Sequence, residues 1–248
     1  MGIVRPTQWF AGIGASEGIA IGPVQLLAAN IVVIDRSISS DQVPRELHRL
    51  QEAIVATDEQ LLMIGRQLEA QNLREGYLIV EAHRLMLKSD ELVEAARGLI
   101  SSEGIAAECA VRRVVDRIVA TFEKMRDPYL RERSADVEAM GERLLGTLLG
   151  LPEVGASCAN VAGSIGVGPA LSPIDAFHLG RINLAGIITE RGGKTAHAAM
   201  IVRALQLPYV LGVRGLCGSV QPGDILIVDG GQGDVVVNPD HYTLTMFQ

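Results

Sequence analysis

The middle of the chain carries apolar residues at helical spacing. Between residues 43 and 68 they recur at alternating steps of four and three, and Thr57 stands at the one seam position without an apolar side chain. This heptad spacing predicts a long helix with a narrow seam for packing on another helix. Shorter helical stretches follow at 76–88, from Ser89 onward, at 105–125 and at 137–148. Four or five helices with short connections indicate an antiparallel bundle.

Both ends of the chain have a different pattern. Glycines among Ile, Val and Leu at 11–27 predict a strand or two with tight turns, and 195–205 has the pattern of a helix. Short apolar runs bounded by Gly, Pro, Asp and Asn are typical of strands. Such runs lie at 186–189, 209–212, 225–230 and 235–239.

This alternation predicts two domains. Residues 1–37 and 151–248 are expected to build one α/β domain together, and residues 38–150 to form an all-α bundle inserted into it. The whole chain is then α+β. A hinge is expected where the chain passes between the domains, near Ile38 and Leu151.

Charge and composition disfavour nucleic-acid binding. The 248 residues include 22 Lys+Arg against 29 Asp+Glu, which gives a net charge of −7 and no cationic excess to neutralise phosphates. Aromatic residues make up only 4%, too few for base-stacking platforms. The acidic balance suits a basic protein partner instead.

Two further patterns point to a cytoplasmic protein. The charge-free stretch 154–174 is broken by Gly, Pro and Ser, so it does not predict a membrane span, and the first ten residues lack the apolar core of a signal peptide. The cysteines have no C-x-x-C spacing, which predicts neither a disulfide framework nor a zinc site. They are Cys109, Cys158 and Cys217.

One segment combines residues suited to phosphate chemistry. In 190–200 a predicted strand passes through Gly192 and Gly193 into a predicted helix, and Thr195 as N-cap would place His197 in the first turn. The free N–H groups and positive dipole end of a helix receive anions and disfavour an imidazolium. His197 is therefore a candidate phosphate acceptor, whereas spacing alone favours an ordinary polar surface histidine. The segment matches only the tail of a Walker P-loop, and no second ligand at i+4 indicates a metal site.

The run GGKTAHAAMIVRALQLPYVLG, at 192–212, resembles the phosphohistidine signature of the phosphoenolpyruvate-utilising enzymes. Other segments resemble the N-terminal half of one member of that family, Enzyme I of the bacterial phosphotransferase system. GIGASEGIAIGPVQLL is similar to its opening strand, and SSDQVPREL to the start of its first long helix. YLIVEAHRLMLKSDELVEAARGLI is similar to the helix pair that docks the phosphocarrier protein HPr. The resemblance covers essentially the whole chain.

The resemblance assigns roles to residues of the glycine loop. It makes His197 the phosphorylated residue, linked through Nε2, and Arg203 a candidate cation for the phosphoryl oxygens. The turn before the histidine consists of Gly192, Gly193, Lys194 and Thr195. Three positions depart from the family pattern: Lys194 stands where Arg is common, Ala196 where Ser or Cys is common, and Ala176 where many members have a Thr that bonds the active histidine.

The resemblance also assigns a docking site for an HPr-like carrier to the predicted bundle. An apolar patch of Leu85, Met86 and Leu92 beside carboxylates suits a small protein with a basic rim. His83 is equally a carrier contact or an ordinary surface residue. The full candidate set is Glu81, His83, Leu85, Met86, Asp90, Glu91, Leu92, Phe122, Met125, Leu130 and Arg133.

The function that the resemblance implies is phosphoryl transfer from phosphoenolpyruvate, through His197, to the histidine of an HPr-like carrier. Because 248 residues leave no room for the barrel that binds phosphoenolpyruvate and Mg²⁺, the chain is expected to be a monomeric N-terminal fragment of a homodimeric enzyme, itself without metal or cofactor. The alternatives are a swivelling domain of a pyruvate phosphate dikinase or phosphoenolpyruvate synthase, and a docking module that transfers no phosphate. Sugar uptake and the nitrogen-related branch are both compatible with the sequence.

Overall fold

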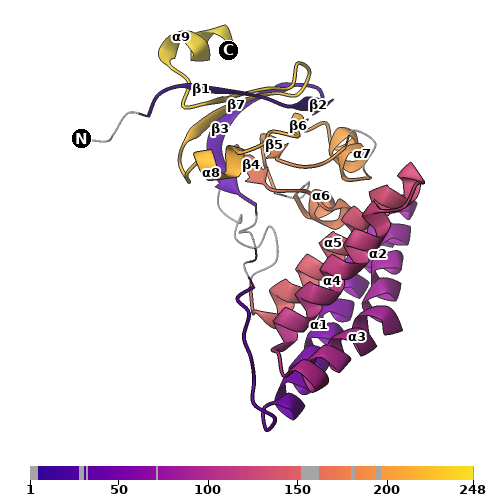
Figure 1. Cartoon of the computed structure of the whole chain (residues 1–248). Helices are drawn as coiled ribbons and strands as arrows, with labels where there is room; N and C mark the ends of the chain where they lie inside the picture. The colour runs from indigo at the N-terminus through magenta and orange to yellow at the C-terminus, as the bar shows by residue number, and fades with distance from the viewer. Residues whose placement is uncertain are drawn as a thin grey trace. The chain divides into compact units, whose positions relative to one another are not determined.

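The computed structural model describes residues 5–27, 31, 33–70, 72–151, 162–179, 182–193 and 197–247. The chain divides into two compact units (Figure 1). Residues 1–30 and 154–248 form one, which we call the sheet unit, and residues 31–153 form the other, which we call the helical unit. Helix and sheet are thus both present, as the predicted α+β class requires.

The helical unit contains five helices among its described residues. The first packs against the second and fifth, and the fourth packs against the third and fifth. Leu50, Leu61 and Leu68 of the predicted heptad are buried, and Thr57 at its seam position donates a hydrogen bond to Thr147 Oγ1 at 3.0 Å. The helices are α1 (Val43–Ala70), α2 (Arg74–Leu87), α3 (Asp90–Glu103), α4 (Ala107–Glu123) and α5 (Pro128–Leu148).

Buried charges hold one end of the helical unit together. Glu46, only 4% exposed, accepts hydrogen bonds from Arg49 at 2.6 Å, from Arg36 at 3.2 Å and from the Ala107 N–H at 3.0 Å. Glu108 accepts from both arginines as well. Burial by itself would raise the pKa of Glu46, but the hydrogen bonds from Ala107 and Arg49 outweigh it and hold that pKa below its usual value. The carboxylate also accepts from one of the first N–H groups of α4, which have no acceptor within the helix.

The segment before α1 belongs to the helical unit. The Ile38 N–H bonds the Gly104 carbonyl at 2.7 Å, and the Ala106 N–H bonds the Arg36 carbonyl at 2.9 Å. The Cys109 thiol donates to the Ile34 carbonyl at 3.3 Å. These bonds correct the expected hinge near Ile38, because that residue is tied to the turn between α3 and α4.

The described strands of the sheet unit form an eight-stranded mixed sheet in the order β1-β8-β7-β3-β4-β5-β6-β2. Strands β3, β4, β5 and β6 run parallel to their neighbours in that series, and the other pairs are antiparallel. The strands are β1 (Gln8–Ala11), β2 (Ile13–Ser16), β3 (Ile19–Leu26), β4 (Ile165–Gly168), β5 (Gly186–Thr189), β6 (Tyr209–Leu211), β7 (Ile225–Asp229) and β8 (Asp234–Val237).

Two helices connect the parallel strands. Helix α6 (Pro173–Leu179) joins β4 to β5, and α7 (His197–Ala204) joins β5 to β6. Residues of both helices pack in one buried cluster with Ile187, Tyr209 and Leu211 of the sheet, so they cover the same face. Two short helices complete the unit, α8 (Leu216–Ser219) and α9 (His241–Met246).

The strands predicted at 186–189, 209–212, 225–230 and 235–239 are confirmed within one or two residues as β5 to β8. Strand β4 and helix α6 were not predicted, because their stretch of Gly, Ser and Pro shows no clear period. None of the described helices combines the length and apolar character needed to cross a membrane.

The backbone approaches itself closely where β7 ends beside β2. A Cβ on Gly230 would collide with the Ser16 carbonyl oxygen and lie 2.9 Å from the Tyr209 amide nitrogen. We therefore expect Gly230→Ala to lower the free energy of unfolding by about 2–3 kcal/mol, because backbone atoms cannot move aside as a side chain can. Gly218→Ala is the control, since nothing lies within 4 Å of a Cβ there. Equal losses for the two variants in denaturant unfolding would contradict this packing.

A second charged cluster links α1 to α2. Asp58 accepts a hydrogen bond from Arg84 Nε at 2.8 Å and one from Lys88 Nζ at 2.7 Å. The bond from Arg84 is the main cause that holds the pKa of Asp58 below its ordinary value of 3.8, against the opposing effect of burial.

Because the folded pKa is the lower one, Asp58 stabilises the fold above about pH 4, and this contribution is lost as the pH falls through the folded pKa. Asp58→Asn should cost about 2 kcal/mol near neutral pH and less as the pH falls from about 5 to 2. Urea unfolding followed by helical circular dichroism measures this, with the exposed Asp116→Asn as control. A difference from wild type that does not change with pH would count against the ion pair.

Candidate functional site

The loop after β5 is held on both sides by backbone hydrogen bonds. The Glu190 N–H bonds the Gly168 carbonyl at 3.2 Å, and the Arg191 N–H bonds the Pro169 carbonyl at 2.9 Å. On the other side, the Val213 N–H bonds the Thr189 carbonyl at 3.1 Å. The loop therefore lies at the carboxyl ends of β4, β5 and β6, the edge at which α/β sheets commonly bind ligands.

Gly192 has the backbone geometry that only glycine adopts readily. Its φ is +140°, and a Cβ there would lie 3.7 Å from both Tyr209 Oη and Leu211 Cβ. Gly192 and Gly193 are both exposed, so their backbone is open to a ligand at the surface.

Helix α7 begins at His197, so the predicted position of this residue in a first helical turn is confirmed. The following Ala198 and Ala199 are 3% and 1% exposed and fix that turn against the sheet. Lys194, Thr195 and Ala196 lie outside the described residues, as does the side chain of His197.

Arg203 lies at the other end of α7. Six residues after His197 correspond to about 9 Å along the helix axis. Its Nε and Nη2 donate to the Ala15 carbonyl at 3.1 and 2.8 Å, which ties α7 to β2. These two bonds leave further guanidinium N–H groups and the charge itself in place, and a role as cation for phosphoryl oxygens stays a prediction.

Helix α6 contributes a buried methyl group near the same face of the sheet. Ala176 is fully buried in the cluster that also holds Ala198 and Tyr209. The Ser172 hydroxyl bonds Asp175 Oδ2 at 2.6 Å and accepts from the Asp175 N–H at 3.0 Å. It therefore serves as the cap of α6.

Three residues around the loop were not predicted from the sequence. Thr189 Oγ1 and Tyr209 Oη form a buried hydrogen bond of 2.9 Å, and Glu190 Oε1 accepts from the Cys217 N–H at 2.9 Å at the start of α8. Burial and the nearby Glu190 raise the pKa of the Cys217 thiol to about 11, so it is protonated near neutral pH. The sequence signals that could have indicated the first pair are a threonine at the end of β5 and a tyrosine at the start of β6, the neighbouring parallel strand.

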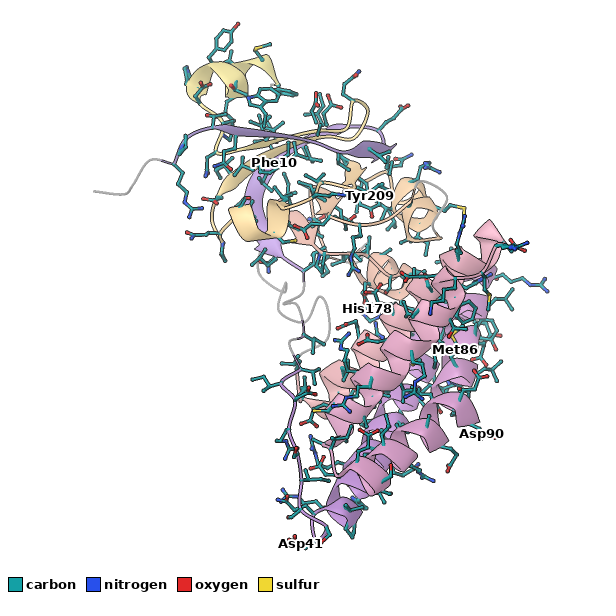
Figure 2. All side chains as sticks on the ribbon, viewed as in Figure 1. Phe10, Asp41, Met86, Asp90, His178 and Tyr209 are labelled. Carbon is teal, nitrogen blue, oxygen red and sulfur yellow. The ribbon has the colours of Figure 1, made fainter. Side chains whose placement is uncertain are left out.

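The candidate docking residues on the helical unit separate into exposed and buried groups. Leu85 is 73% exposed, Asp90 and Glu91 are exposed, and Met86 is half-buried. Met86 and Asp90 both lie at the right of the helical unit in Figure 2. The half-buried members are Glu81, Phe122, Met125 and Arg133, while the Leu130 side chain lies outside the described residues.

His83 and Leu92 are corrections to the predicted docking set. Each is only 1% exposed, so neither presents a surface to a partner. His83 Nε2 lies 4.0 Å from Asp136 Oδ1, and Asp136 Oδ2 accepts a hydrogen bond from Arg133 at 2.8 Å. The helical period carries His83 to the inner side of α2 together with Val80 and Leu87.

Glu81 is held by a neighbour on its own helix. Its Oε1 accepts from Arg84 Nη1 at 2.8 Å, and the same guanidinium bonds Asp58. The exposed carboxylates available to a basic partner in this region are therefore those at the start of α3. Among the described residues, no group of three or more His, Cys, Asp and Glu is arranged to hold a metal ion.

Comparison with known proteins identifies two matching family models. "PEP-utilising enzyme, N-terminal" matches residues 11–133, and "PEP-utilising enzyme, mobile domain" matches residues 161–233. The second range contains the glycine loop and α7.

Curated relatives carry the name phosphoenolpyruvate-protein phosphotransferase. The proteins from Staphylococcus aureus (strain Mu50) and Bacillus subtilis (strain 168) are each 33% identical, over 96% and 97% of this chain. The chain spans only 41% and 42% of their lengths.

Two solved structures cover the same region. The NMR solution structure of Enzyme I (nEIt) is 30% identical with a TM-score of 0.72, and the match covers 96% of both chains. The N-terminal domain of Enzyme 1 – Nitrogen is 26% identical with a TM-score of 0.61, over 96% of this chain and 98% of that one. The chain therefore belongs to the PEP-utilising enzyme family, and within it is similar to the N-terminal part of Enzyme I.

Proposed function

We propose that this chain accepts a phosphoryl group on His197 and exchanges it with the histidine of an HPr-like carrier. The sheet unit is then the phosphohistidine domain, and the helical unit is an HPr-binding bundle inserted into it. The observation that carries the proposal is the start of α7 at His197, directly after a glycine loop held at the carboxyl ends of three parallel strands.

The chemistry that this arrangement supports is transfer between two histidines. The N–P bond on the carrier histidine breaks as a bond forms from His197 Nε2 to phosphorus, and the carrier nitrogen recovers its electron pair. Positioning and charge neutralisation account for most of the catalysis in such transfers. The exposed glycine backbone and the N-terminal end of α7, with its positive dipole, suit the phosphoryl oxygens.

The carrier is expected on the face of the helical unit that contains Leu85 and the start of α3. Leu85 supplies exposed apolar area, and Asp90 and Glu91 supply negative charge beside it. An apolar centre with charged groups at its rim is the usual composition of a protein docking site.

Phosphoenolpyruvate is the proposed original donor, as the name of the curated relatives implies. We assign its site, Mg²⁺ and the contacts of a homodimer to the part of those relatives that this chain does not span. Exchange with the carrier in the cytoplasm then needs only the residues present here, as a monomer.

The phosphorylation site is tested by incubating the chain with HPr that a complete Enzyme I has phosphorylated. We expect acid-labile, base-stable phosphate on the wild-type chain and none on His197→Ala. The control is His241→Ala, which removes an exposed histidine of the same unit. Label that persists in His197→Ala would overturn the proposal, and absence of label from the wild-type chain would leave a docking module only.

The docking face is tested by Leu85→Asp, which should weaken HPr binding by at least about tenfold because it places a charge in the apolar centre of the contact. Val55→Asp is the matched control, since Val55 is 48% exposed on α1 and lies outside the candidate set. Isothermal titration calorimetry measures both dissociation constants. A larger effect at Val55 than at Leu85 would place the carrier on another face.

A further inference from the structure

Two buried hydroxyls lie directly beneath the glycine loop. Thr189 at the end of β5 is 0% exposed and Tyr209 at the start of β6 is 2% exposed, and their oxygens are 2.9 Å apart. A Cβ on Gly192 would lie 3.7 Å from Tyr209 Oη and 3.8 Å from Thr189 Oγ1. The hydroxyl pair therefore lies near Gly192, whose backbone has the positive φ that favours glycine.

Tyr209 also belongs to the buried cluster that contains the start of α7. Other members of this cluster are Ala198 and Ala199 in the first turn of α7, and Ala176 of α6 (Figure 2 labels Tyr209). One side chain thus has its hydroxyl near Gly192 and belongs to the cluster that contains the first turn of α7.

The hydroxyls are not needed to fill this space. Phenylalanine and valine would occupy the same volume, whereas buried hydroxyls lose their bonds to water and need a partner. Once the two hydroxyls are paired, their hydrogen bond fixes the orientation of both side chains, which apolar side chains of the same shape would not do. Burial raises the pKa of Tyr209, and the bond with Thr189 opposes that shift without cancelling it, so the phenol stays protonated near neutral pH.

We infer that Tyr209 is a positioning residue for phosphoryl transfer: its hydroxyl, paired with Thr189, holds the Gly192 backbone in place and so sets the entry of the loop into α7 at His197. This inference rests on the proposed function of His197. It assigns to Tyr209 no contact with the phosphoryl group itself.

The test is Tyr209→Phe in the full chain, with transfer from phosphorylated HPr followed over a range of HPr concentrations. Because the carrier is bound by the helical unit, KM should be unchanged, while kcat should fall by about tenfold as the loop loses its support. Thr189→Val should give a similar fall, and the double variant no greater one, since both remove the same bond. Tyr242→Phe, at a tyrosine that is 74% exposed on α9, is the control with wild-type kinetics.

The amide resonance of Gly192 supplies a readout that does not depend on turnover. It should shift in Tyr209→Phe and Thr189→Val and stay in place in Tyr242→Phe. If Tyr209→Phe lowers the melting temperature but leaves kcat unchanged, the pair is only part of the core and the inference is wrong. If neither wild type nor Tyr242→Phe takes up phosphate, the proposed function itself fails and the inference fails with it.

Discussion

The set of backbone hydrogen bonds around the loop after β5 is the constraint on which the rest of the site depends. Glu190 and Arg191 donate to carbonyls at the end of β4, and Val213 donates to the end of β5. Because β4, β5 and β6 are parallel neighbours, their carboxyl ends meet at one edge, and the loop is fixed there before it enters α7. The first part of the loop is thus fixed by the sheet, and α7 is tied to β2 through Arg203 and the Ala15 carbonyl.

The helical unit is organised by charge as well as by its apolar seam. Glu46 and Glu108 share Arg36 and Arg49 at one end of the unit, while Asp58, Arg84 and Lys88 link α1 to α2 along its length. The first network holds the segment before α1 through Arg36. In the second, Arg84 also forms an ion pair with Glu81, in the region proposed for the carrier. Arg84 therefore joins two carboxylates, one that links α1 to α2 and one among the residues proposed for the carrier.

Sequence patterns predicted the parts of the fold that have a clear period. The heptad from Leu50 to Leu68 and the strand at 186–189 follow directly from spacing. Spacing could not show that His83 faces inward, because α2 carries apolar residues on its exposed side (Leu78, Leu85) as well as in the core, and only packing decides between the two sides. The same holds for Leu92 on α3, which only packing places in the core. Strand β4 and α6 lie in a stretch of small residues that has no period.

The sequence predicted the strand, the glycine loop and the helix that follows, but not the residues that support the loop. Gly192 and His197 could be found because a glycine loop that opens a helix is a local pattern. Tyr209 and Glu190 act across the sheet, on residues that are 20 and 27 positions away along the chain, and no local pattern reveals such partners. Arg203 shows the converse, since its place on α7 was foreseen and its bond to Ala15 was not.

The central claim, that phosphate is carried by the first residue of α7, is tested most directly by locating the phosphoryl group on the wild-type chain. After incubation with phosphorylated HPr, peptides prepared at alkaline pH can be sequenced by mass spectrometry, and the chain offers five histidines as candidates. The account predicts the phosphoryl group on His197. A phosphoryl group on His48, His83, His178 or His241, with His197 unmodified, would contradict it.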